Sequence, residues 1–361
     1  MTHYDIAVLP GDGIGVEVMN AALEILRALE PRLGRKFTLT VHPAGAQLYA
    51  ETGNALPDDT LKACREAHAI LFGAMGLPHV RAQNGTEIIP QLDLRFALDL
   101  YAGVRPIKTW QGLPVPLRDP RAAEIDLVLV RESTEGLFYA RGRGTIEGTG
   151  AEAHALDTMK ITHQGTARVC DFALQLAAQR QAAGKRGHVT NVDKANVFTS
   201  MAYWRQIFEQ QAKAFPNITT ENAYVDAMAL NLVMKPWQYD VLVTENMFGD
   251  ILSDLIAALV GGMGMAPSAD IGDNHAVFQP AHGTAPDIAG RGIANPSAML
   301  LSAAMMLEWL ANRHDDAALA DGAQAVEQAL QTSFATQEVL PFDFGGSSTT
   351  SDIANAVLRH L

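Results

Sequence analysis

Apolar residues near the middle of the chain change from a continuous run to a helical spacing. Val241 to Thr244 form an apolar run that is typical of a buried strand, and from Gly249 onward apolar residues recur at every third or fourth position. These residues are Ile251, Leu252, Leu255, Ile256, Leu259 and Val260. The pair Gly261-Gly262 follows them, so the pattern predicts a strand that leads into a helix ending at this pair.

Two aspartates stand in the first turns of this predicted helix. Asp250 and Asp254 are four residues apart, so their carboxylates lie on one face of the helix. Two carboxylates on adjacent turns repel each other unless a cation lies between them. The alternative is a solvated acidic turn that the helix dipole stabilises. The pair therefore predicts either a cation site or a solvated helix start.

The N-terminal region shows the same order of strand, turn and helix. Asp5 to Leu9 is an apolar strand, the turn Pro10 to Gly15 is glycine-rich, and residues 18–29 carry a helical stripe. The glycines have the spacing G-x-G-x-G, not the G-x-G-x-x-G of a dinucleotide-binding turn, and no acidic residue closes the next strand, Phe37 to Val41. The pattern argues against a Rossmann fold, while a turn that brings the backbone close to a ligand remains open.

Strand and helix patterns also alternate along the rest of the chain, which predicts an α/β protein. The further predicted helices are Asp58–Ala67, Gln91–Leu100, Gly165–Ala183, Thr199–Phe215, Ala227–Met234 and Ala298–Ala311. The further predicted strands are Ala69–Phe72, Ile125–Val130, His188–Val192 and Asn222–Val225. Residues 136–165 are glycine-rich and irregular, with short alternating segments, and we expect a projecting hairpin, or arm, that contacts another subunit.

Composition limits the class of protein. With 361 residues and 48% hydrophobic content, the chain is long enough to divide into two lobes. Its net charge of −13 argues against binding to nucleic acid or to anionic membranes. No run has the length of a membrane span, and the N-terminus lacks a signal-peptide pattern. The cysteines Cys64 and Cys170 are far apart, which is typical of a reducing compartment, and we expect a cytoplasmic protein.

Three arginines lie at or near the ends of predicted elements. Arg105 belongs to a short extended piece, Arg131 follows a strand, and Arg95 lies on the helix before them. A lone arginine at such a place is usually a surface ion-pair partner. Three of them beside apolar elements of an acidic protein favour a site for a carboxylate substrate, because the guanidinium fork binds a carboxylate through two hydrogen bonds.

Lys194 and Asp226 each lie near the end of a predicted strand. Ligands of open α/β sheets bind at the carboxyl ends of strands, so Lys194 is a candidate for a reactive amine, the alternative being an exposed loop lysine. Asp226 adds a third carboxylate to Asp250 and Asp254. Three oxygen ligands without histidine or cysteine favour Mg²⁺ or Mn²⁺.

A long loop of small and polar residues runs from Gln279 to Pro296 and connects a strand to an apolar helix. Loops of this length in compact domains usually carry function, the alternative being a surface crossover. We therefore expect a functional loop.

Several long motifs follow one another along the chain. They read LPGDGIGVEV, RESTEGLFYA, NVDKANVF, YVDAMALNLV, TENMFGDILSDLIAALVGGMGMAPSADIG, HGTAPDIAGRGIANPSAMLLSAAMML and DFGG. With them the sequence resembles the metal-dependent β-decarboxylating dehydrogenases, the family of isopropylmalate, isocitrate, homoisocitrate, tartrate and D-malate dehydrogenases, over nearly its whole length. The resemblance implies a two-lobed α/β fold of the isopropylmalate/isocitrate dehydrogenase type, not a Rossmann fold, with a projecting dimer arm in the second lobe.

The resemblance also divides the chain and implies roles for residues. Residues 1–104 and 258–361 match a cofactor-binding lobe, and residues 105–257, with the arm at about 136–165, match a lobe for dimerisation and metal binding. The residues that match the substrate's carboxylate-binding arginines are Arg95, Arg105 and Arg131. The residues that match metal ligands are Asp226, Asp250 and Asp254. The residues that match the cofactor loop are His282, Gly283, Thr284, Ala285, Pro286, Asp287 and Asn295.

The expected catalytic residues are Lys194, Tyr139 and Asp226. Lys194 matches the lysine that takes the proton of the substrate's hydroxyl group, and Tyr139 matches the tyrosine that acts as an acid after CO₂ leaves. In that family the residues matching Lys194 and Asp226 reach the neighbouring subunit's site, which implies a homodimer or a dimer-based oligomer with shared active sites. Asp287 suits the ribose hydroxyls of NAD but would repel the 2′-phosphate of NADP, so NAD is expected together with Mg²⁺ or Mn²⁺.

The segment that reads the substrate's 3-substituent departs from the family pattern. Leu92 and Gln91 stand three and four positions before Arg95. The resemblance implies aliphatic residues at both positions in isopropylmalate dehydrogenases. No hydroxyl residue of the isocitrate type stands in Pro90 to Leu94. We therefore expect a small-molecule diacid with a small or polar substituent. Gln279 stands where many relatives have glutamate, and the sequence offers no interpretation of this change.

Three functions follow from these expectations. The main one is an NAD- and metal-dependent oxidative decarboxylation of a malate-like, tartrate-like or 3-substituted (2R)-hydroxy-diacid to a 2-keto acid and CO₂. The alternative within the same class is 3-isopropylmalate dehydrogenase. The alternative of another class is a diacid-binding sensor that has lost catalysis, against which the presence of Lys194, Tyr139 and the three aspartates speaks.

Overall fold

The chain forms two compact units that each contain a sheet and helices. The computed structural model describes residues 2–361. Unit 1 consists of Met1–Leu100, Thr109–Ala123 and Ala257–Leu361, and unit 2 consists of Tyr101–Lys108 and Glu124–Ile256. Thr109–Ala123, which the resemblance assigns to the second lobe, thus belongs to unit 1. The functions expected for the two lobes stay predictions.

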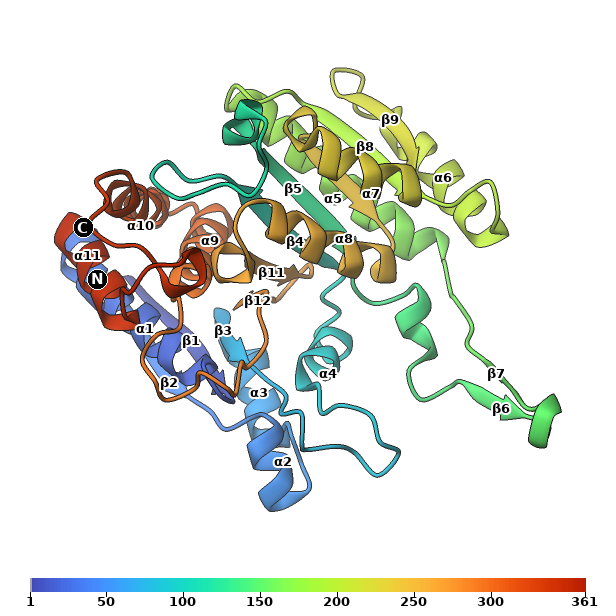
Figure 1. Ribbon diagram of the computed structural model, residues 1–361, viewed down its shortest axis with the longest axis horizontal. Helices are drawn as coiled ribbons and strands as arrows, with labels where there is room; N and C mark the ends of the chain where they lie inside the picture. Colours follow the sequence, from blue (N-terminus) through green and yellow to red (C-terminus); the bar gives the residue numbers. More distant parts are fainter. Residues whose placement is uncertain (1) are drawn as a thin grey trace. The chain divides into compact units, whose positions relative to one another are not determined.

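The strands of unit 1 form a mostly parallel sheet in the order β2-β1-β3-β12-β11. Their bounds are β1 (Thr2–Gly11), β2 (Arg35–Val41), β3 (Ala69–Ala74), β11 (Pro267–Ile271) and β12 (Ala276–Pro280). β1 pairs in parallel with β2 and β3, β12 pairs in parallel with β3, and β11 is antiparallel to β12. The carboxyl ends of β1, β3 and β12 therefore meet at one edge of this sheet (Figure 1).

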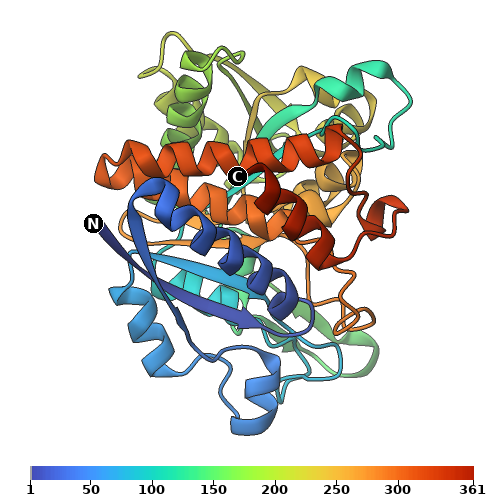
Figure 2. The same cartoon turned by 90° about the vertical axis from the view of Figure 1, so that its left-hand side faces the viewer.

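The long helices of unit 1 pack against one another. Their bounds, with those of the shorter helices, are α1 (Gly15–Leu33), α2 (Ala46–Thr52), α3 (Asp58–Glu66), α4 (Pro90–Ala97), α9 (Ser297–His314), α10 (Ala317–Ala335) and α11 (Thr350–His360). Figure 2 shows α9 and α10 side by side, with α1 and α11 next to them. α9 is buried along most of its length, which explains why its sequence is apolar on nearly every side.

The strands of unit 2 are mostly parallel and are hydrogen-bonded in the order β4-β5-β10-β8-β9. Their bounds are β4 (Ala102–Lys108), β5 (Asp126–Glu132), β8 (His188–Asp193), β9 (Thr219–Tyr224) and β10 (Val241–Thr244). β10 lies between β5 and β8 and is parallel to both, β9 is parallel to β8, and β4 is antiparallel to β5. The carboxyl ends of four strands, β5, β10, β8 and β9, therefore share one edge, where ligands of α/β sheets bind.

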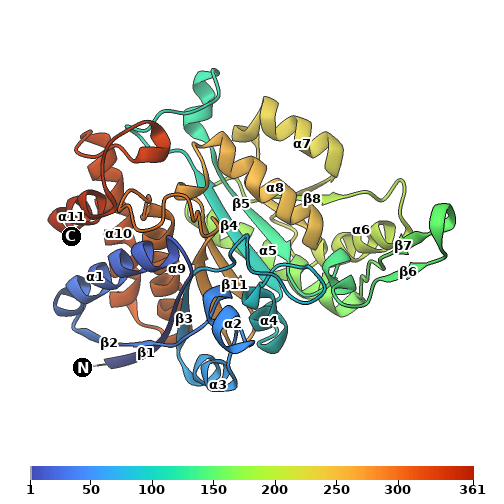
Figure 3. The same cartoon turned by 60° about the horizontal axis from the view of Figure 1, so that its bottom comes forward.

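Unit 2 also carries helices and a separate hairpin. The helices are α5 (His163–Ala182), α6 (Thr199–Ala212), α7 (Val225–Met234) and α8 (Asn246–Leu259), the last of which ends in unit 1. The hairpin consists of β6 (Thr145–Glu147) and β7 (His154–Leu156), and all its side chains are exposed. It stands away from the other strands of unit 2 (Figures 1 and 3). The expected arm is therefore present, while its contact with another subunit stays a prediction.

The helix that carries the two aspartates begins before the predicted start at Gly249. α8 starts at Asn246, because the buried carboxylate of Glu245 accepts hydrogen bonds from the backbone N–H groups of Met247 (3.1 Å) and Phe248 (2.7 Å). These N–H groups have no carbonyl partner within the helix. Glutamate is not a common residue at this capping position, so no local sequence pattern indicates the earlier start. Among residues 2–361 we find no helix whose length and apolar character would let it cross a bilayer.

Candidate functional site

Arg131 and Asp250 meet at the carboxyl edge of the unit 2 sheet. Arg131 lies in β5, and Asp250 lies in α8, which follows the adjacent strand β10. Arg131 Nη1 forms an ion pair with Asp250. Arg131 Nε and Nη2 both donate to Asn246 Oδ1, at 2.9 and 2.7 Å, and the Phe138 ring centre lies 5.0 Å from the guanidinium carbon. Asn246 and Phe138 therefore fix the orientation of a buried arginine.

Asp254 completes this group on the next turn of α8. Burial and the negative charge of Asp250 raise the pKa of the Asp254 carboxyl, while the positive charges of Arg105 and Arg131 oppose the rise. Arg105 lies in β4, the strand paired with β5, and is 5% exposed. Two carboxylates and two buried arginines are thus close enough to influence one another, as expected for a site that holds a cation and a diacid.

Lys194 and Asp226 form a second group in unit 2. They follow β8 and β9, which are adjacent and parallel, and the Lys194 ammonium forms an ion pair with the Asp226 carboxylate. The same ammonium lies 5.9 Å from the centre of the Tyr224 ring. The hydrogen bond from Lys194 lowers the pKa of Asp226, which keeps that carboxylate charged at neutral pH.

The three predicted metal ligands do not come together within one chain. Across residues 2–361, no three His, Cys, Asp or Glu side chains are arranged to hold a metal ion. Asp250 and Asp254 belong to the first group, and Asp226 belongs to the second. The site with all three carboxylates from two copies of the chain, which the resemblance implies, stays a prediction.

Tyr139 lies between two cations. It belongs to a short 3-10 helix, Leu137–Ala140, at the base of the arm. The guanidinium carbon of Arg143 lies 4.0 Å from the centre of its ring, and the ammonium of Lys160 lies 4.8 Å from the same centre. Both cations therefore contact the aromatic ring of Tyr139.

The predicted substrate residues of unit 1 lie on α4. Arg95 is buried and its Nε donates to Asp270 Oδ2 at 2.9 Å. Leu92 is buried as well, as expected for an apolar wall. Gln91 Oε1 is shielded from solvent and has no hydrogen-bond partner among the described residues. Asp270 was not a sequence candidate, because only the pairing of distant segments brings it to Arg95.

The predicted cofactor loop rests on the glycine-rich turn that follows β1. Ile14 N–H donates to the carbonyl of Thr284 at 2.9 Å, and Thr284 Oγ1 donates to the carbonyl of Gly76 at 2.6 Å. A Cβ at Gly13 would overlap the carbonyl oxygen of Thr284. Asp12 accepts hydrogen bonds from three backbone N–H groups, including that of Gly76, and so fixes the turn. The close backbone approach at this turn is thus made to the loop.

Polar groups of the loop are left for a ligand. His282 Nδ1 lies 2.9 Å from the Gly283 carbonyl, and His282 Nε2 is shielded from solvent without a partner in the described part of the chain. Burial lowers the pKa of His282, so its ring is neutral at neutral pH. The Asp287 side chain is exposed, and Asn295 Nδ2 donates to the Asp343 carboxylate at 3.2 Å. The arrangement suits a ligand with hydroxyl and amide groups.

Substitution of Gly13 by alanine is expected to weaken cofactor binding. Gly13 has a φ of +55°, and its added Cβ would push against Thr284, so the loop must shift. We expect the KM for NAD to rise by about tenfold or more, because displacements of this kind have large effects on binding geometry. The matched control is Gly34→Ala, which has a similar φ of +62° but meets no atom within 4 Å. Equal KM values for the two variants in NADH-formation assays would contradict this account of the turn.

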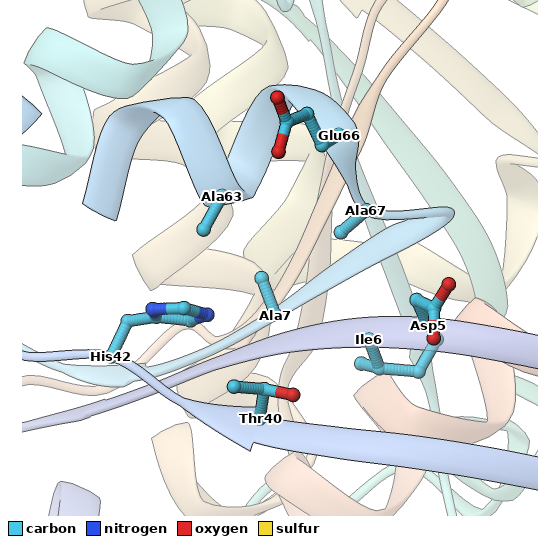
Figure 4. A pocket seen from close by; sticks show the side chains of 8 residues that line it. All are labelled: Asp5, Ile6, Ala7, Thr40, His42, Ala63, Glu66 and Ala67. Atoms are coloured by element: carbon cyan, nitrogen blue, oxygen red, sulfur yellow. The ribbon is translucent and has the colours of Figure 1, made fainter. Parts of the chain in front are cut away.

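A surface pocket in unit 1 contains none of the predicted site residues (Figure 4). Its volume is about 240 Å³. The residues that line it are Asp5, Ile6, Ala7, Thr40, His42, Ala63, Glu66 and Ala67. These lining residues include two carboxylates but no lysine or arginine. The pocket therefore does not suit a diacid, because its own negative charges would repel the ligand's carboxylates.

Known proteins resemble the chain over its whole length. The family model described as isocitrate/isopropylmalate dehydrogenase matches residues 5–357. The 3-isopropylmalate dehydrogenase of Aquifex aeolicus (strain VF5) is 40% identical over 368 residues, covering 100% of this chain and 98% of that protein. The 3-isopropylmalate/3-methylmalate dehydrogenase of Methanocaldococcus jannaschii is 40% identical over 359 residues, 99% of each chain. The crystal structure of isocitrate dehydrogenase from Methylococcus capsulatus matches with a TM-score of 0.87 at 33% identity, covering 99% of each chain.

Dehydrogenases of this family use NAD and a divalent metal ion, Mg²⁺ or Mn²⁺. The residues present fit both groups. Asp250 and Asp254 supply the oxygen donors that these ions prefer, and burial, together with the negative charge of Asp250, raises the pKa of Asp254. His282 Nε2 lacks a partner within residues 2–361, and a Cβ at Gly283 would meet no atom within 4 Å, so the loop backbone is open to a cofactor.

Proposed function

The chain belongs to the isocitrate/isopropylmalate dehydrogenase family and is a β-decarboxylating dehydrogenase, and from this premise we propose that it oxidises and decarboxylates 3-isopropylmalate or a closely related 3-alkylmalate. NAD would supply the hydride acceptor, and the products would be a 2-keto acid, CO₂ and NADH. The names of the relatives at 40% identity support an alkyl substituent more strongly than the malate-like or tartrate-like substrate expected from Gln91.

The observation that carries the proposed reaction is the group of Asp250, Asp254, Arg105 and Arg131. A (2R)-hydroxy-diacid brings two carboxylates, which need cationic partners, and a hydroxyl group that a divalent ion would bind together with the neighbouring carboxylate. Buried arginines beside a carboxylate pair on α8 offer both kinds of partner in one place. Arg95, the third predicted arginine, lies in unit 1, and its role as a substrate ligand stays a prediction.

Lys194 and Tyr139 provide the two proton transfers in this proposal. Lys194 takes the proton of the 2-hydroxyl group, and bound NAD would supply the acceptor for the hydride that leaves the same carbon. The resulting 2-keto group makes the β-carboxylate leave as CO₂, and the electron pair of the broken bond stays on the substrate. Tyr139 then donates its proton to C3, which completes the 2-keto acid. The divalent ion supplies polarisation of the hydroxyl group and stabilisation of negative charge when it is bound.

We infer that the active unit is a dimer with shared sites. Asp226 lies on the same face of α7 as Leu230, Val233 and Met234, since these residues follow it by four, seven and eight positions. Leu230 is 64% exposed and Met234 is 65% exposed, and Ile251 beside Asp250 is also exposed. Exposed apolar faces of this kind mark protein contacts. A second copy that covers them would bring its own Lys194 and Asp226 toward Asp250 and Asp254.

A polar 3-substituent is the second candidate, and Gln91 supports it. Its Oε1 is shielded from solvent and lacks a partner among residues 2–361, and a buried unsatisfied acceptor is unfavourable unless a ligand donates to it. A hydroxyl group on C3 of the substrate, as in tartrate, would be such a donor. The alkyl groups of the first candidate would leave this oxygen unsatisfied.

Comparison of substrates tests the proposal directly. NADH formation with Mn²⁺ is measured for 3-isopropylmalate, D-malate, tartrate and isocitrate, and we expect the highest kcat/KM for 3-isopropylmalate. A strong preference for tartrate would reject the alkyl substrate in favour of the second candidate. Binding without turnover for every diacid would reject the enzyme and leave the sensor that has lost catalysis.

A further inference from the structure

Arg95 bonds to the buried Asp270, which in turn accepts a hydrogen bond from the buried Gln279. Its Nε donates to Asp270 Oδ2 at 2.9 Å, and Gln279 Nε2 donates to the same oxygen at 2.7 Å. Asp270 lies in β11 and Gln279 lies in β12, which are antiparallel neighbours in unit 1. Asp270 is 1% exposed and Gln279 is 7% exposed, so all three side chains are removed from water.

The charges of this group balance. Arg95 carries one positive charge, Asp270 carries one negative charge, and Gln279 is neutral. A buried guanidinium needs a carboxylate partner, because an unpaired buried charge is strongly unfavourable. A glutamate at position 279 would place a second carboxylate at hydrogen-bonding distance from Asp270, and two such groups cannot both ionise beside a single cation. Glutamine supplies a donor at this position without adding charge.

The hydrogen bond to Asp270 uses only one nitrogen of the Arg95 guanidinium group. Within residues 2–361 the side chain of Arg95 bonds to Asp270 through Nε, and Nη1 and Nη2 remain for a substrate carboxylate. Gln279 is fixed in turn, because its backbone carbonyl accepts a hydrogen bond from Ser302 Oγ at 2.8 Å. It also lies in the strand that leads directly into the loop at His282.

We propose that Asp270 and Gln279 are positioning residues that orient Arg95 and set its effective charge toward the diacid. This inference rests on the proposed function, in which Arg95 binds a substrate carboxylate. It also explains the glutamine at position 279, since Asp270 already supplies the single carboxylate that Arg95 requires.

The Gln279→Glu variant tests the inference through the pH dependence of KM. At high pH the added carboxylate leaves the group with an excess negative charge, so we expect the KM for 3-isopropylmalate to rise by about tenfold. At lower pH the two carboxylates share a proton, so the KM should return toward the wild-type value between about pH 9 and pH 6. The kcat and the KM for NAD should change little, because Arg95 acts on substrate binding. The control is Gln328→Glu, which adds the same charge at an exposed position of α10.

The double variant Asp270→Asn/Gln279→Glu again gives the group a single carboxylate, which now lies on β12 instead of β11. We expect it to recover a KM within about threefold of the wild-type value and to lose the added pH dependence. A pH-independent KM in Gln279→Glu, or a double variant no better than Gln279→Glu, would overturn the inference. Equal losses in kcat, KM for NAD and thermal stability would also overturn it, since they indicate a structural role only. A wild-type protein without turnover of any diacid would instead reject the proposed function itself.

Discussion

Replacement of Lys194 by alanine is expected to lower kcat by about 10²- to 10⁴-fold, the usual contribution of a positioned acid–base group. The amine is held by Asp226 and lies near the Tyr224 ring, so it is oriented before substrate binds. Without it, no side chain takes the hydroxyl proton as the hydride leaves. The KM for the diacid should change much less than kcat, because Lys194 acts mainly in the transition state. Initial rates of NADH formation measure both constants.

The matched control for this variant is Lys185→Ala. Lys185 also forms an ion pair with an aspartate of unit 2, Asp126, but lies outside the predicted site. Its removal should leave kcat and KM unchanged. A Lys194→Ala enzyme that keeps more than about a tenth of the wild-type kcat would show that another group takes the proton.

Replacement of Asp254 by asparagine is expected to abolish the response to Mn²⁺ and to reduce activity by roughly 10³-fold, since metal stabilisation of charge contributes several kcal/mol. The same change removes the repulsion between Asp254 and Asp250, so the metal-free variant should unfold at the same or a higher temperature than the wild type. Mn²⁺ at about 100 times its Kd would stabilise the wild type by about 2.7 kcal/mol. The variant should show no such gain in thermal unfolding.

The control for Asp254 is Asp321→Asn, which removes an exposed carboxylate from α10. This variant should keep both the activity and the stabilisation by Mn²⁺. An Asp254→Asn variant that is still stabilised by Mn²⁺ to the wild-type extent would show that the carboxylates of α8 do not hold the ion. Destabilisation without metal would show that Asp254 has a structural role instead.

Residues at strand ends were the part of the site that the sequence could predict. Arg131, Lys194 and Asp226 follow or end apolar runs, and parallel strands place such positions at one edge of a sheet. The ion pairs of Arg131 with Asp250 and of Lys194 with Asp226 follow from the order of β5, β10, β8 and β9. That strand order depends on pairing between distant segments. The sequence alone could therefore name the candidate residues but not predict which of them lie together.

The sequence alone could not predict the contacts between residues that lie in distant segments of the chain. No local pattern links Asp270 and Gln279 to Arg95. Asp270 bonds to Arg95, and the antiparallel pairing of β11 with β12 brings Gln279 to Asp270. The glycine-rich turn was expected to bring the backbone close to a ligand, which stays a prediction, and the contact of Gly13 with Thr284 could not be foreseen because the two residues are remote in sequence. The sequence also gave no sign that Glu245 starts α8 earlier, because its effect depends on a buried side-chain geometry.

The central claim is that each active site combines Asp250 and Asp254 of one copy with Lys194 and Asp226 of another. Mixing the inactive Lys194→Ala and Asp254→Asn proteins after dissociation and reassociation tests it most directly. Random pairing makes half of the dimers mixed, and each mixed dimer has one intact site of two, so the account predicts recovery of about a quarter of the wild-type activity. A mixture that stays as inactive as its two components would contradict shared sites.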